Sequence, residues 1–331
     1  MKKNKFIISN FNKHLIAMIS LLFIYLFYLS IPSLYDKGKL QKELTSKVLE
    51  EFKINLSISS EISYTILPSP HIVIKNVKLF NNDLKNPKEI SQIKKLNIFI
   101  SQKYFLDQNN LVIKKILIED ANFYFQSVDY NFLKKLLEKK FSKKEVLIKK
   151  SNFFFKDKNN KTISIFPIFK INLFYDEKKL INNVNVDGEV FKIPFNIKWI
   201  KNFENKISAE TVLKLKKLRL EMKNVSSNEN EVYSANNTLR VGNTKLFSGY
   251  KIDNYVITIF SQGTNLVNSD TSYKGKINLN PFDLKLDINL NKIDINKFLD
   301  TNSIFFELLK SNILFSRNLS AIISITSKNI I

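Results

Sequence analysis

The side chains that most often carry enzyme chemistry are scarce in this sequence. The chain has 331 residues, no cysteine and only two histidines, His14 and His71. Zinc sites need several such ligands and a thiol nucleophile needs cysteine, so we expect neither kind of site. The six glycines are scattered, and no glycine-rich phosphate loop or G-x-S-x-G nucleophile turn occurs. We therefore expect no cofactor and no metal.

One pair of carboxylates, Glu119 and Asp120, could in principle do glycosidase chemistry. Two carboxylates that flank a glycosidic bond can act there as acid and base. Neighbouring residues on a strand point to opposite faces, however, so a role at a strand edge or turn is the better interpretation. We predict a protein that is not an enzyme, and keep an exported hydrolase that uses carboxylates alone as an alternative.

The chain is strongly basic, with Lys+Arg 52 against Asp+Glu 30 and a net charge of +22. The excess accompanies heavy use of Lys, Asn, Ile and Phe, a bias that an AT-rich genome produces by itself. We interpret most of the charge as solvated surface and expect no nucleic-acid partner. Where lysines cluster, in 134–150 and 214–217, anionic lipid headgroups are the alternative partner.

The elements that must position any site begin with an apolar segment, residues 15–31 (LIAMISLLFIYLFYLSI). About 17 apolar residues are at the low end of what crosses a hydrocarbon core. Lysines precede the segment, and no acidic residue occurs before Asp36, so the N-terminus should stay in the cytoplasm. We predict a basic cytoplasmic tail over 1–14 and a transmembrane signal-anchor over 15–31. Its membrane-facing residues would be Leu15, Ile19, Leu22, Phe23, Leu26 and Ile31.

A cleaved signal peptide is the alternative interpretation of this segment. Such a peptide needs small residues before the cleavage site, where this chain has bulky Phe27, Tyr28 and Leu29. We therefore expect a single-pass anchor that stays in the inner membrane, with Tyr25, Tyr28 and Tyr35 at the outer interface. With either interpretation the region 36–331 is exported.

The sequence of the exported region predicts a short helix followed mainly by strands. A helix is predicted over 40–52 and a second over 128–140, with Asp129 as the N-cap of the second. Elsewhere apolar and polar residues alternate, which is typical of antiparallel strands with one apolar face. The apolar stripe of the first helix is Leu40, Leu44, Val48 and Phe52, and one alternating set is Phe169, Ile171, Leu173 and Tyr175.

These patterns predict a mainly β fold with two short helices after the anchor. Loosely recurring strand–turn–strand units, without an exact repeat, favour an elongated antiparallel sheet over a closed enzyme domain. The candidates for its apolar face are Ile193, Phe195, Ile197, Trp199, Leu284, Leu286 and Ile288.

The order of parts resembles the AsmA-like family of bacterial envelope proteins. In that family a strand, a proline-containing corner and a second strand follow the anchor, and here Leu67, Pro68 and Pro70 occupy the corner. The second strand has the form P-x-apolar-x-apolar-x-x-apolar-x-apolar, and a later family element is similar to residues 284–299. The matching positions are Ile72, Ile74, Val77 and Leu79, and later Ile293, Asp294, Ile295, Phe298 and Leu299.

The resemblance implies a protein anchored in the inner membrane, with 36–331 in the periplasm as an AsmA-like β domain of outer-membrane biogenesis. It implies an elongated, curved antiparallel sheet whose apolar groove is lined by the apolar-face candidates of 193–199 and 284–288. This groove would bind or guide phospholipid, or assist outer-membrane assembly beside other envelope proteins. Two features depart from the family pattern. Ser60 stands where a glycine is usual, and the sequence ends at Ile331 while longer relatives continue, so the resemblance implies a short or a truncated member.

A second interpretation is an exported structural or protein-binding β-sandwich. A second sheet would then close the apolar face into a dry core, and the protein would bind a partner through its sheet edges. The two interpretations differ in whether the apolar face is open or covered.

Overall fold

The computed structural model describes residues 10–58, 62–81, 88–126, 129–157, 159–204, 208–229, 232–241, 244–253, 256–261, 272–279, 282–300, 303, 306, 309–310 and 320–331. The helices are α1 (Asn10–Ser30), α2 (Lys37–Phe52), α3 (Tyr130–Glu138) and α4 (Ile295–Phe298), with short 3-10 turns η1 (Ile31–Leu34), η2 (Gln102–Tyr104), η3 (Gln108–Asn110) and η5 (Lys216–Leu218). The first nine strands are β1 (Asn55–Ser57), β2 (Ile62–Thr65), β3 (His71–Phe80), β4 (Glu89–Ile100), β5 (Ile113–Gln126), β6 (Glu145–Lys156), β7 (Thr162–Asp176), β8 (Ile181–Val190) and β9 (Ile193–Asn202). The others are β10 (Ser208–Leu215), β11 (Leu220–Glu229), β12 (Val232–Val241), β13 (Thr244–Asp253), β14 (Val256–Ser261), β15 (Ser272–Leu279), β16 (Phe282–Ile293) and β17 (Ser320–Ile330).

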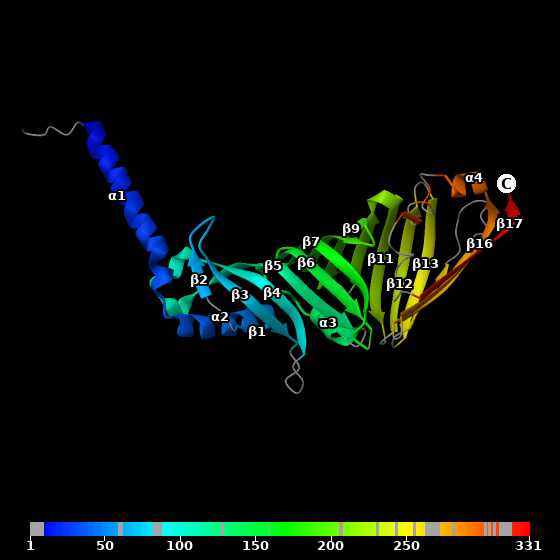
Figure 1. The fold of residues 1–331 in the computed structure, drawn as a ribbon, viewed down its shortest axis with the longest axis horizontal. Coiled ribbons are helices and arrows are strands. Elements are labelled where there is room, and N and C mark those ends of the chain that lie inside the picture. Colours follow the sequence, from blue (N-terminus) through cyan, green and yellow to red (C-terminus); the bar gives the residue numbers. More distant parts are fainter. Residues whose placement is uncertain are drawn as a thin grey trace, which may run out of the picture.

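Helix α1 projects away from the rest of the chain at one end of the sheet (Figure 1). Its 21 residues make a rod about 31 Å long, close to the thickness of a hydrocarbon core. The stretch Asn12–Leu34 is long and apolar enough to cross a membrane. From Leu15 to Phe27 its apolar side chains are exposed on all sides, unlike those of an amphipathic helix packed on a core, whereas Leu29 is buried against the body of the protein.

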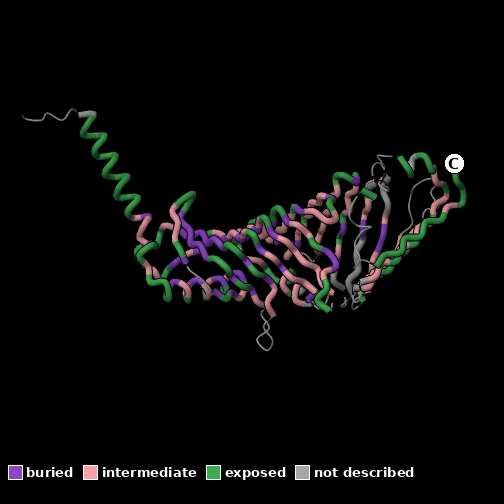
Figure 2. Tube along the Cα trace, in the orientation of Figure 1, coloured by how far each residue is buried: buried purple, intermediate pink, exposed green. Residues whose placement is uncertain are grey.

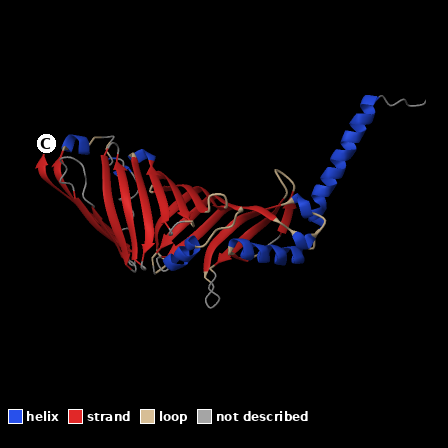
Figure 3. Cartoon of the chain, turned by 180° about the vertical axis from the view of Figure 1, so that it is seen from behind, coloured by secondary structure: helices blue, strands red, loops and turns tan. Residues whose placement is uncertain are grey.

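The described strands form one elongated, twisted sheet (Figures 1 and 3). β1 and β2 share one edge of β3, and from β2 onward each strand pairs with the next one in sequence. The mainly β prediction is therefore confirmed. The expectation of a purely antiparallel sheet is wrong, because β5–β6 and β16–β17 are parallel pairs. Both pairs follow connections that contain a helix and are long enough to return the chain to its starting end.

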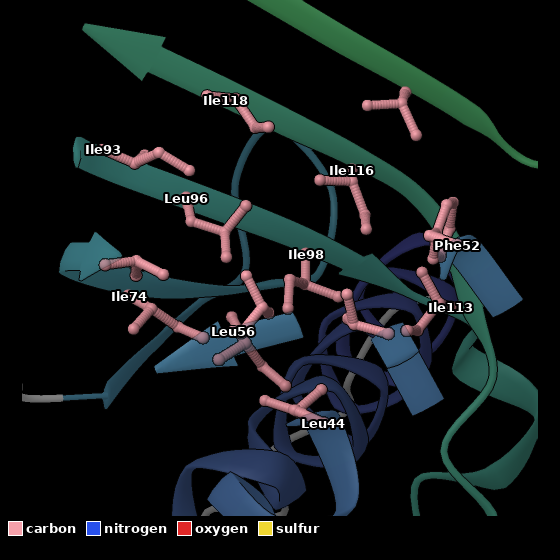
Figure 4. Close-up of a cluster of buried hydrophobic side chains, with 14 of the residues drawn as sticks. Leu44, Phe52, Leu56, Ile74, Ile93, Leu96, Ile98, Ile113, Ile116 and Ile118 are labelled. Carbon is pink, nitrogen blue, oxygen red and sulfur yellow. The ribbon is translucent and has the colours of Figure 1, made fainter. Parts of the chain in front are cut away.

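Helix α2 covers the sheet at the anchor end. Asp36 caps it by accepting a hydrogen bond from the backbone N–H of Lys39 at 2.7 Å. The predicted stripe of Leu40, Leu44, Val48 and Phe52 is buried in a core with strands β3–β5. Figure 4 shows Leu44 and Phe52 of α2 beside isoleucines of these strands. We call the side of the sheet that carries this core the inner face.

Three strands carry one residue in the left-handed backbone conformation at the same level of the sheet. Asn76, Asp120 and Lys150 have positive φ angles of 51°, 54° and 48°, and the pairing register is the same on both sides of each. Asn76 and Asp120 lie within a pattern of apolar-x-apolar-x-x-apolar, and Ser151 takes the last apolar position of this pattern after Lys150. The buried positions on both sides of each left-handed residue therefore stay on the inner face. The strand pattern of residues 72–79 thus recurs in 116–123 and 146–153, although these segments share few identical residues.

Helix α3 carries the chain from β5 to β6. Asn182 Nδ2 donates to the carbonyl of Lys139 at 2.8 Å, which holds the C-terminal end of α3 against the inner side of β8. Asp129 lies at the N-cap position but makes no capping hydrogen bond, which corrects the predicted role. Its carboxylate accepts instead from Lys88 Nζ, at 2.7 and 2.8 Å, and from the backbone N–H of Gln126.

Candidate functional site

One row of apolar side chains crosses ten strands of the inner face without interruption. The five members on β3–β7 are between 0% and 7% exposed, whereas the five on β8–β12 are all partly exposed. The strand registers align this row as Ile74, Leu96, Ile118, Ile148, Ile171, Val186, Ile197, Leu213, Met222 and Leu239.

The apolar row becomes more exposed where helices no longer cover the inner face. α2 buries the anchor end, and α3 reaches the strand ends of β8 and β9. Among the described residues beyond β9, Leu218 is the only apolar side chain that is buried. Figure 2 shows the buried positions gathered toward the anchor end and the exposed ones increasing toward the C-terminus. The inner face is therefore a closed core at one end and an incompletely covered apolar surface farther on.

Both sets of predicted groove residues lie on this inner face. Ile193, Phe195, Ile197 and Trp199 point to it from β9, where Ile193 is buried and the other three are partly exposed. The register of β10–β15 carries the same face to β16, where the partly exposed residues are Leu284, Leu286 and Ile288. Six strands separate the two sets, so they share one surface but do not form one compact site.

A second row of the inner face changes its chemistry at β10. Its members on β3–β9 are Ile72, Ile98, Ile116, Val146, Leu173, Val184 and Trp199, and it continues as Thr211, Asn224, Asn237 and Ser248. Asn224 Nδ2 donates to Asn237 Oδ1 at 2.7 Å and to the Tyr250 hydroxyl at 3.1 Å. The sequence pattern did not reveal this polar row. Alternation identifies the inner face by its apolar residues, and here Thr, Asn and Ser occupy inner-face positions.

A buried lysine lies where α3 meets the inner face. Lys201 follows Trp199 on the inner side of β9, and its Nζ donates to the carbonyl of Glu138 at 3.2 Å. Burial lowers the pKa of the Lys201 ammonium, and the nearby Glu138 carboxylate acts in the opposite direction. The ring of Phe141 lies 6.1 Å from that of Trp199, so the margin of the apolar surface is closed here by aromatic packing.

The predicted anchor residues are exposed along α1 but partly buried just after its end. Exposed positions along the helix are Leu15, Ile19, Leu22, Phe23 and Leu26, whereas Ile31 is partly buried in η1. The predicted corner lies next to this end of the helix. Its Leu67–Pro68 bond is cis, Leu67 and Pro68 are exposed, and Pro70 is buried. A cavity of about 400 Å³ lies between the end of α1 and the corner. It is lined by Ser30, Ser33, Tyr64, Thr65, Ile66 and Leu67.

Tyrosine hydroxyls fasten α1 to the sheet. Tyr28 donates to the carbonyl of Gln102, Tyr35 to that of Phe105 at 2.7 Å, and Tyr64 to that of Leu29 at 2.6 Å. Burial raises the pKa of Tyr64 to about 12, and Tyr35 adds to the shift. Burial also raises the pKa of Tyr35. Tyr28 and Tyr35 were expected at the outer interface, and the structure shows that their hydroxyls also bond the body of the protein.

The residues singled out for chemistry have structural partners. His71 is buried, with Nδ1 2.7 Å from the carbonyl of Ser69 and its ring stacked on Phe99. Glu119 pairs with Lys95, and Asp120 has a left-handed backbone within β5. Within the described residues, no three His, Asp or Glu side chains form a group that could hold a metal ion.

Comparison of the chain with protein-family models, with curated proteins and with solved structures found no match. The features that bear on function are therefore the partly exposed inner face, the apolar helix α1 and the junction between them.

Proposed function

We propose that this chain is a single-pass inner-membrane protein, similar to the AsmA-like family, whose inner face binds or guides phospholipid. The observation that carries the proposal is the apolar row that is buried on β3–β7 and partly exposed on β8–β12. Burial of an acyl chain contributes roughly 0.8 kcal/mol per CH₂. A lipid tail would therefore be stabilised along the uncovered half of the row without a ligand-specific pocket.

The proposed orientation rests on α1 and the charges around it. Lysines precede the apolar segment, which favours a cytoplasmic N-terminus and a periplasmic location for residues 36–331. The proposed activity is binding or transfer of lipid in the service of outer-membrane assembly, with envelope proteins as further partners. It involves no bond breaking, so it requires no catalytic residue and no cofactor.

Site-specific crosslinking in the full-length chain tests this proposal. A photoactivatable phenylalanine analogue is placed at Ile197 or Leu286 on the inner face, and at the neighbouring exposed Lys198 or Lys285 as matched controls. Phospholipid labelled in its phosphate should attach to the protein at the first two positions and much less at the controls. Equal labelling at all four positions, or none at Ile197 and Leu286, would contradict a lipid-binding inner face.

Binding of a protein partner through a sheet edge is the second candidate, and β17 favours it. Among the described strands, β17 pairs only with β16. Ile322 and Ile323 are 56% and 53% exposed, and an edge strand of this kind can pair with a strand of another chain. Crosslinks from Ser324 to an envelope protein, without lipid labelling at Ile197, would favour this candidate.

A further inference from the structure

The three most exposed apolar side chains described outside α1 surround the foot of that helix. They are Leu106, Leu34 and Leu67, which are 80%, 77% and 76% exposed. They come from three segments that are far apart in sequence: the connection between β4 and β5, the turn η1, and the corner before β3. A single exposed leucine is ordinary on a protein surface, whereas three around the end of an apolar helix indicate a partner surface.

Hydrogen bonds and a shared cavity show which residues of α1 and η1 lie beside the β4–β5 connection and the corner. The hydroxyls of Tyr25 and Tyr28 reach Gln102, so the β4–β5 connection begins beside residues 25–28. Tyr35 donates to the Phe105 carbonyl and Gln108 to the Asp36 carbonyl, so the part that carries Leu106 lies level with residues 35–36. The cavity shared by Ser30, Ser33 and Leu67 places the corner level with residues 30–33, and the apolar span continues to Leu34. Leu67 therefore lies beside the last turn of the span, and Leu106 lies at its outer end.

We propose that Leu34, Leu67 and Leu106 insert into the outer leaflet of the same membrane that α1 crosses. We call these three residues the apolar collar. The inference rests on the proposed anchoring of α1 and deepens it by naming a second membrane-binding surface. Lipid is the occupant that fits, because Leu34 ends the apolar span of α1 and Leu67 and Leu106 lie next to that end.

The residues next to the collar are of the types found at the interface between a membrane and water. Tyr104 and Lys103 lie exposed in the same connection as Leu106. Tyrosine is enriched at the membrane interface, and lysine there meets anionic headgroups. Because tyrosine hydroxyls bind the foot of α1 to the sheet, insertion of the collar would also hold the sheet at a fixed tilt. The closed end of the inner face would then lie nearest the membrane.

Depth-dependent fluorescence quenching in the full-length chain tests the collar. The single tryptophan is removed by Trp199→Phe, and one new tryptophan is introduced as Leu67→Trp or Leu106→Trp. The chain is reconstituted into bilayers of phosphatidylethanolamine and phosphatidylglycerol that carry bromine at a shallow or a deep acyl position. Leu137→Trp on α3 is the matched control, because it is also an exposed leucine but lies away from α1. Phe23→Trp, in the middle of α1, reports separately on the anchor.

The expected result is quenching at 67 and 106 at least about twofold stronger than at 137, and strongest with shallow bromine, as at a membrane interface. Quenching at 67 and 106 no stronger than at 137, with strong quenching at 23, would overturn the collar and leave the anchor intact. Weak quenching at 23 as well would overturn the membrane anchoring on which the collar depends. A change at 67 and 106 that follows protein concentration instead of bromine would assign the surface to a second copy and overturn lipid insertion.

Discussion

Phe195 on β9 lies directly opposite Gly188 on β8, and its ring occupies the space that a side chain at 188 would need. A Cβ atom at position 188 would lie 2.7 Å from Phe195 Cζ and 2.8 Å from the carbonyl oxygen of Pro167. Glycine is therefore required here by space, and the aromatic ring of the neighbouring strand fills the place of the missing side chain. The pair lies where the buried part of the inner face gives way to the partly exposed part.

Gly188→Ala should destabilise the folded chain by about 1–3 kcal/mol, as overpacking of a filled site does. The Pro167 carbonyl belongs to the paired backbone of β7 and cannot move aside cheaply. Thermal unfolding of the full chain in detergent, followed by circular dichroism, measures the loss. Gly38→Ala in α2 is the control, since its nearest atom, Asp36 Oδ1, is at an ordinary 3.4 Å. Equal losses for the two variants would refute crowding as the cause.

The loss of stability on truncating a side chain of the apolar row should depend on the strand that carries it. Ile148→Ala, in the buried half, should cost about 2–5 kcal/mol because it leaves a cavity. Leu239→Ala, at a partly exposed position of the same row, should cost less than about 1 kcal/mol. Urea unfolding of both variants provides the comparison. Similar costs at both positions would mean that the row is covered along its whole length, as in a closed sandwich.

A charge on the open part of the inner face should abolish lipid binding. Phe195→Asp and Leu286→Asp each place a carboxylate where acyl chains would lie, and Lys285→Asp places the same charge on the opposite face. Phospholipid retained by the purified chain can be counted by mass spectrometry after detergent exchange. If both inner-face variants fold and retain as much lipid as Lys285→Asp, the assignment of the inner face is wrong.

The alternation of apolar residues predicted the strands well, but it could not locate every bulge. Phe169 was grouped with Ile171, Leu173 and Tyr175, yet the register of β7 shifts between Ile168 and Lys170. Ile168 therefore packs into the core, and Phe169 is exposed. A one-residue bulge reverses the facing of all residues on one side of it, so its position depends on the pairing of the neighbouring strand.

The candidate surface was predicted only in part for a related reason. Each strand shows which of its residues share a face, and this placed Ile197 and Leu286 correctly on apolar faces. The sequence does not show how strands align, so neither the unbroken apolar row nor the polar row beside it was visible. The sequence also did not show the collar, because Leu34, Leu67 and Leu106 come near one end of α1 only when hydrogen bonds dock the helix onto the body of the protein.

The asparagine pair of the polar row should behave as a coupled unit. Asn224→Leu removes the donor of the 2.7 Å hydrogen bond to Asn237 Oδ1 and leaves that buried oxygen unpaired. The single change should cost about 1–3 kcal/mol, whereas the double change to Leu at 224 and 237 should cost little more, because it removes the unpaired Asn237 oxygen. The partly exposed Tyr250 hydroxyl loses its donor equally in both variants. A double-mutant cycle by urea unfolding measures this coupling. Additive costs would show that the hydrogen bond contributes nothing of its own.

The junction between α1 and the sheet should weaken in strong alkali. The pKa of Tyr64 is about 12 in the folded chain against 10.0 for a free tyrosine, because burial disfavours the phenolate. The unfolded chain thus loses this proton first, so the stabilisation is complete below pH 10 and is lost as the pH rises from 10 to 12. Tyr35, whose pKa burial also raises, acts in the same direction.

Tyr64→Phe isolates this contribution from the lysines, which titrate alike in both proteins. The variant loses the hydrogen bond to the Leu29 carbonyl and should be less stable than the parent chain by about 0.5–1.5 kcal/mol at pH 8. The difference should shrink at pH 11, because only the parent chain loses the titrating hydroxyl's contribution there. Urea unfolding at the two pH values measures it, with the exposed Tyr104→Phe as a control that costs little at pH 8. A difference that stays constant between pH 8 and pH 11 would show that the fold does not raise the pKa of the Tyr64 hydroxyl, whereas a difference near zero at pH 8 would show that this hydrogen bond does not stabilise the docking of α1.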